Sequence, residues 1–156
     1  MGVAFGLLHA RALPRTLEDL DSINFALGVE EFDVARHRPH PPGYPLYIAI
    51  GKLSAPVIHA IRPAADRDRL AADGLAVWGV VAGALAPFVL TEFWIAVGFP
   101  PLLAALAATL AIASPLFWFT ASRPLTDTPG LVAAAFVQTL LIRGLRKSSR
   151  TDALPR

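Results

Sequence analysis

The sequence predicts an all-α protein, a polytopic membrane helix bundle. Of its 156 residues, 54% are hydrophobic and only 17% are charged, whereas soluble domains average 45–50% apolar and about 25% charged residues. The charges are also clustered, because residues 74–91, 93–122 and 128–142 contain none. An uncharged apolar run of about 18 residues or more is typical of a transmembrane helix. This composition excludes a soluble enzyme and a disordered chain, and the absence of cysteine excludes a disulfide scaffold.

The first part of the chain is predicted to lie mostly outside the hydrocarbon core. Residues 1–10 are apolar, but as a helix they reach about 15 Å, half of a bilayer core, so we interpret them as the end of a truncated first span. Residues 11–73 are then an outer loop with juxtamembrane helices. Within this loop, residues 44–61 are apolar but contain two prolines, a lysine and a histidine. These residues favour a helix lying along the membrane interface, although a full span is left open.

Three full spans are expected over residues 74–92, 100–121 and 129–145. Alanine and leucine dominate them, and open sheet edges do not survive in lipid, so we expect helices. A basic cluster follows in the tail at 146–156 and just before it, at Arg143, Arg146, Lys147 and Arg150. The positive-inside rule places this end in the cytoplasm, and counting spans backward places residues 122–128 on the extracytoplasmic face. No basic stripe interleaved with aromatic residues is present, so we expect no nucleic-acid partner.

Asp21 is the first candidate for chemistry. It lies in the string DSINFALG, where an apolar stretch resumes after a polar one. A carboxylate at a membrane surface is partly desolvated, so it can accept a proton from a hydroxyl group. The other acidic residues of this loop, Asp19 among them, are interpreted mainly as solvated charges.

A proline-rich string, ARHRPHPPGYPLY, follows at residues 35–47. Its prolines stiffen the chain, and basic side chains at headgroup depth attract phosphate. Its tyrosines suit the headgroup region. A loop that merely anchors the chain to anionic lipid explains the same residues equally well. The side chains in question are Arg36, His37, Arg38, His40, Tyr44 and Tyr47.

The polar loop SRPLTDTPG at residues 122–130 contains Arg123 and Asp127. Helix capping explains its Ser and Thr residues. It does not explain Asp127, and an ionisable residue held between two spans is a functional candidate by default.

Together, DSINFALG, RPHPPGYPLYIAIGKL and RPLTDTPG resemble type C membrane glycosyltransferases, most closely the protein O-mannosyltransferase-like group (glycosyltransferase family 39-like). The resemblance covers roughly residues 15–145. It implies an N-terminal fragment of an integral-membrane enzyme that transfers a sugar, mannose being one candidate, from a polyprenyl-phosphate donor to a protein or glycan acceptor on the outer face of the cell membrane. By motif, Asp21 corresponds to the catalytic base and Asp127 to the second acidic residue. The Pro-Pro segment beside His40 corresponds to the part that holds the lipid phosphate.

The implied reaction is inverting transfer, in which the lipid phosphate leaves as the acceptor hydroxyl attacks. The expected lipid-phosphate and substrate-binding residues are Arg36, Arg38, His40, Tyr44 and Arg123. Because histidine is only partly charged at neutral pH, Arg36 or Arg38 is expected to supply the fixed charge. No cofactor or metal site is predicted, and a divalent cation is left open. The alternative is a non-catalytic membrane subunit or a transporter piece, which is disfavoured because the carboxylates lie at span ends rather than inside broken spans. A third interpretation is a fragment of the enzyme without turnover of its own.

Overall fold

The computed structural model describes residues 2–11, 13, 16–17, 19–63, 65 and 67–152, and it confirms the all-α prediction for this part of the chain. The described residues form seven α-helices and one 3-10 turn and contain no strand. Two of these helices, α4 and α7, are long and apolar enough to cross a membrane, which supports a helical membrane protein. The elements are α1 (Gly2–Arg11), α2 (Leu20–Glu30), η1 (Val34–Arg36), α3 (Pro45–Ile61), α4 (Arg67–Val97), α5 (Pro101–Ile112), α6 (Pro115–Ala121) and α7 (Asp127–Asp152).

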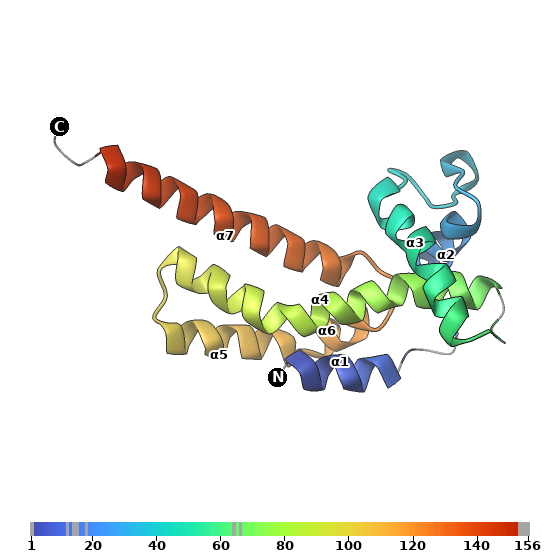
Figure 1. Cartoon of the computed structure of the whole chain (residues 1–156), viewed down its shortest axis with the longest axis horizontal. Coiled ribbons are helices and arrows are strands. Elements are labelled where there is room, and N and C mark those ends of the chain that lie inside the picture. The colour runs from blue at the N-terminus through green and yellow to red at the C-terminus, as the bar shows by residue number, and fades with distance from the viewer. Residues whose placement is uncertain are drawn as a thin grey trace.

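Helix α4 is the centre of the molecule and packs against every other α-helix. Its 31 residues make it about 46 Å long at 1.5 Å per residue. Figure 1 shows α1 and α5 lying along it, while α2 and α3 gather around its N-terminal end. Small residues on α4 let its neighbours approach closely, as is common in membrane helix pairs. A Cβ atom on Gly79, for example, would lie 2.7 Å from the carbonyl oxygen of Ala121 at the end of α6.

The segment predicted as one span over residues 100–121 is divided in the structure. Helices α5 and α6 meet at an angle of 67°. The side chain of Ser114 accepts a hydrogen bond from the backbone N–H of Phe117, and Pro115 occupies the first position of α6. This combination of an N-cap serine and a following proline starts a new helix, so the chain turns where hydropathy alone indicated continuity.

Two helices also extend beyond their expected limits. Helix α7 continues through the basic tail to Asp152, and α4 begins at Arg67, inside the predicted outer loop. The early start of α4 is stabilised by Asp73, whose buried carboxylate lies 2.8 Å from Arg62 and 3.5 Å from Arg69. The opposite charges of this segment therefore pair directly.

The apolar interior consists of two clusters. One joins α1, α4, α5, α6 and α7 and includes Phe5, Ala86 and Phe117. The other lies under α2 and α3, where Phe25 and Ile48 pack against Leu75 of α4. The second cluster holds the polar segments of the chain at one end of the bundle.

Candidate functional site

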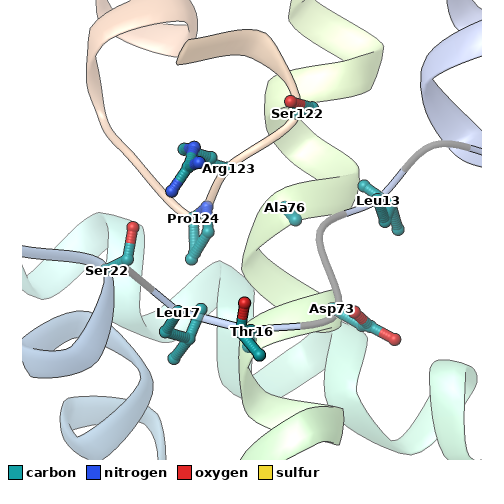
Figure 2. Close-up of a pocket in the computed structure, with 10 residues that line it drawn as sticks. Leu13, Thr16, Leu17, Ser22, Asp73, Ala76, Ser122, Arg123 and Pro124 are labelled. Atoms are coloured by element: carbon teal, nitrogen blue, oxygen red, sulfur yellow. The ribbon is translucent and has the colours of Figure 1, made fainter. Parts of the chain in front are cut away.

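The start of α2 and the polar loop between α6 and α7, at residues 122–126, meet at this end of the bundle. Asp19, just before α2, lies 3.5 Å from Arg123, measured from Oδ2 to a guanidinium nitrogen. The hydroxyl of Tyr47 in α3 donates a hydrogen bond of 3.1 Å to the backbone carbonyl of Leu125. Figure 2 shows Arg123 and Pro124 next to Ser22 and Leu17. The structure therefore brings residues 122–127 against the region that contains Asp21.

The carboxylate of Asp21 faces the proline-rich string. Asp21 lies in the first turn of α2, its side chain is 60% exposed, and its Oδ1 is 3.6 Å from Nδ1 of His40. That nitrogen is itself buried and has no hydrogen-bond partner within the described residues. A proton on Nδ1 would point toward the carboxylate of Asp21. The pair therefore combines an exposed carboxylate with a ring nitrogen that makes no hydrogen bond to the described residues.

The position of His40 is set by packing around Phe25, which is almost fully buried. The ring centroid of Phe25 lies 5.4 Å from that of His40, 5.0 Å from Tyr44 and 5.2 Å from Tyr47. These distances are in the range where aromatic rings stabilise one another. Gly28 of α2 contributes by having no side chain, because a Cβ atom there would lie 2.8 Å from the ring of Pro39.

A sharp turn connects this string to α3. Gly43 has a φ of +92° and Tyr44 a φ of +44°, both in the left-handed region that glycine adopts most easily. Pro45 then occupies the first turn of α3, where its missing N–H is not needed. The local backbone thus accounts for glycine at position 43 and proline at position 45. Tyr44 is half-buried, with its ring in the aromatic cluster.

Arg36 and Arg38, two of the predicted phosphate-binding residues, lie at the surface in ion pairs. Arg38 is 2.7 Å from Glu31, and Arg36 is 3.3 Å from Asp33. Asp33 also accepts hydrogen bonds from the backbone N–H groups of Ala35 and Arg36, so it caps the 3-10 turn and is more than the solvated charge that we expected. Exposed pairs of this kind contribute about 0–1 kcal/mol, so neither arginine is held strongly by its acidic partner.

Arg123, expected at a membrane surface, is instead buried. Its side chain is only 11% exposed, and its guanidinium carbon lies 4.0 Å from the ring centre of Phe119. It lines a cavity of about 10 Å³ together with Ser22, Asp73 and Pro124 (Figure 2). This volume holds about one water molecule and is too small for a phosphate group. Arg123 therefore contacts the start of α2, and the structure offers no room for a lipid phosphate in its cavity.

Asp127 is the first residue of α7 and is exposed. It lines a groove between α5, α6 and α7 together with Ser114, Phe117 and Thr120. The neighbouring Thr128 lies inside the first turn of α7, after its first residue, and its hydroxyl is 2.9 Å from that of Thr120. Burial raises the pKa of the Tyr47 hydroxyl above its ordinary value, and the nearby negative charge of Asp127 raises it further. Asp127 thus lies close enough to α3 to affect its electrostatics.

Sequence reasoning missed two residues of this site, Asp19 and Tyr47. Asp19, interpreted as a solvated charge, is the N-cap of α2 and accepts hydrogen bonds from both the backbone N–H and the hydroxyl of Ser22, at 2.7 and 2.6 Å. The spacing Asp-x-x-Ser before an apolar run was a usable signal for this cap. Tyr47, expected at headgroup depth, is 7% exposed, and no local pattern distinguishes it from Tyr44.

Comparison with protein-family models, with characterised proteins and with solved structures finds no match for this chain. Within the described residues, no three His, Asp or Glu side chains gather closely enough to hold a metal ion.

Proposed function

We propose that the chain forms part of an integral-membrane glycosyltransferase that uses a polyprenyl-phosphate sugar, such as polyprenyl-phosphate mannose, and belongs to the type C superfamily. The observation that carries the proposal is the pairing of Asp21 with His40. An exposed carboxylate faces the unpartnered ring nitrogen of the HPPGYP string, and two arginines, Arg36 and Arg38, lie on the same string within exchangeable ion pairs. The proposal thus combines a proton acceptor that lies next to His40 with two arginines of the same string that suit a phosphate.

In the proposed reaction, Asp21 takes the proton of the acceptor hydroxyl as the acceptor oxygen attacks the anomeric carbon of the sugar. The bond between that carbon and the phosphate oxygen breaks, and its electron pair leaves with the lipid phosphate. His40, Arg36 and Arg38 stabilise the negative charge that develops on this leaving group. Attack opposite to the leaving group inverts the anomeric centre. Asp127, on the adjoining segment, orients the acceptor or the sugar.

The proposal includes a membrane arrangement. Helices α4 and α7 and the bent pair α5–α6 are three crossings, and α3 lies along the interface. The α2–α3 end of the bundle then faces the extracytoplasmic side of the cell membrane. Support comes from Figure 1, in which α4 and α7 both begin at the α2–α3 end, and from the pairing of Arg143, in the basic region, with Glu92 near the other end of α4.

The experiment compares Asp21→Asn with Asp33→Asn in the full chain, reconstituted in liposomes with polyprenyl-phosphate mannose and a threonine-rich peptide acceptor. Asp21→Asn removes the proton acceptor while keeping shape, so the transfer rate should fall by about a hundred- to ten-thousand-fold. Asp33→Asn is the matched control, because asparagine caps a turn as well as aspartate does. Near-normal transfer by Asp21→Asn would mean that Asp21 is not the base. An equal loss in both variants would point to general damage to the segment.

A further inference from the structure

Two side-chain contacts hold the polar loop at residues 122–126 against α2 and α3. One is the ion pair between Asp19 and Arg123, and the other is the hydrogen bond from Tyr47 to the carbonyl of Leu125. We refer to these two contacts together as the clasp. The partners are 104 and 78 residues apart in the sequence. Arg123 and Leu125, by contrast, are separated by a single residue. The clasp therefore holds one short stretch of chain at two points.

Each side of the clasp is itself fixed. Asp19 is held by two hydrogen bonds to Ser22, which is fully buried. Arg123 is stacked over Phe119 in a buried position where an unpaired guanidinium would be strongly unfavourable. Tyr47 is packed edge-on against Phe25, and its buried hydroxyl needs a partner. None of the three side chains has the freedom of a surface residue.

The clasp lies next to both candidate carboxylates. Asp21 follows Asp19 by two residues, and Asp127 follows Leu125 by two residues. Helices α2 and α7 begin at these same points, so fixing Asp19 and Leu125 fixes the first turn of each helix and the carboxylate that it carries. Asp19 has its own oxygens engaged by Ser22 and Arg123, which leaves Asp21 as the exposed acceptor.

We propose that Asp19, Arg123 and Tyr47 are positioning residues that hold Asp21 and Asp127 at a fixed separation. The inference rests on the proposed function for its catalytic meaning. Its geometric content, that the clasp sets the distance between the starts of α2 and α7, does not depend on any activity.

The geometric content is tested with spin labels on the full chain in detergent micelles. The chain lacks cysteine, so Leu20→Cys and Leu131→Cys, at sites 71% and 47% exposed, introduce two unique labels. The distance distribution measured by pulsed electron paramagnetic resonance should be narrow. Tyr47→Phe combined with Arg123→Gln should broaden it, because both contacts are lost while the aromatic packing is kept.

Two further variants make the distance test specific. Tyr44→Phe, the matched removal of a tyrosine hydroxyl from the same cluster, should leave the distribution narrow. Arg123→Lys combined with intact Tyr47 keeps a cation opposite Asp19 and should also preserve it. An unchanged distribution in the Tyr47→Phe, Arg123→Gln double variant would overturn the proposal.

The catalytic meaning is tested by transfer kinetics on the same double variant. Misplacement by about 1 Å can lower a rate about a hundredfold, so kcat should fall by that order. KM for the lipid-phosphate donor should change little, because the phosphate contacts proposed for His40, Arg36 and Arg38 are retained. A broadened distance with unchanged kcat would show that the clasp does not position catalytic groups. Absence of transfer even in the unsubstituted chain would refute the proposed function, and the distance measurement would still decide whether the clasp exists.

Discussion

Replacing Gly79 by alanine tests a close backbone approach between α4 and the end of α6. The added Cβ would lie 2.7 Å from the carbonyl oxygen of Ala121 and 3.3 Å from that of Arg123. Both obstacles are backbone atoms, which cannot rotate away as a flexible side chain would. The end of α6 and the start of the polar loop at residues 122–126 must therefore move away from α4, by several tenths of an ångström.

The size of the effect follows from two opposing contributions. Inserting a methyl group into a packed interior costs about 1–3 kcal/mol, while glycine to alanine inside a helix is worth up to about 1 kcal/mol in the other direction. The net loss for Gly79→Ala is about 0–2 kcal/mol. Gly144→Ala in α7 isolates the second contribution, because a Cβ there meets nothing within 4 Å. The difference between the two variants should therefore be about 1–3 kcal/mol.

The assay is unfolding of the purified chain in mixed micelles with increasing sodium dodecyl sulfate, followed by far-ultraviolet circular dichroism. Gly144→Ala should leave the midpoint unchanged or raise it, and Gly79→Ala should lower it relative to Gly144→Ala. An equal change in the free energy of unfolding for the two substitutions would show that α4 does not approach Ala121 this closely. The placement of Arg123, two residues after Ala121, would then also be refuted.

Two other predictions concern pH and membrane sidedness. Because burial and Asp127 raise the pKa of Tyr47 in the folded chain, the unfolded chain loses this proton first, so the stabilising effect is complete below about pH 10 and declines as pH rises above it. Alkaline unfolding curves should show this decline in the natural chain and a smaller one in Tyr47→Phe, and identical slopes would argue against a buried hydroxyl. Single cysteines at Asn24 and Thr126, labelled with an impermeant maleimide in oriented vesicles, should react from the same side, and reaction from opposite sides would exclude the proposed membrane arrangement.

Much of the site could be anticipated from local sequence. The string HPPGYP indicated a rigid corner, and the structure explains it through the positive φ angles of Gly43 and Tyr44 and the proline at the start of α3. The place of Asp21 at the start of a helix was indicated by the apolar residues that follow it. The roles of Asp19, Tyr47 and Arg123 were not evident, because each depends on a partner far away in the sequence.

The sequence by itself determined the class of the protein, since long uncharged apolar runs are compatible only with helices that bury or face apolar surroundings. It also determined where the polar segments lie along the chain. Only the tertiary structure decided that α5 and α6 are separate helices and that Arg123 turns inward to Asp19. The physical reason is that hydropathy measures how a residue interacts with its solvent, whereas a buried ion pair, a hydrogen bond to a distant carbonyl or a helix contact at Gly79 depends on which surfaces meet once the chain has folded.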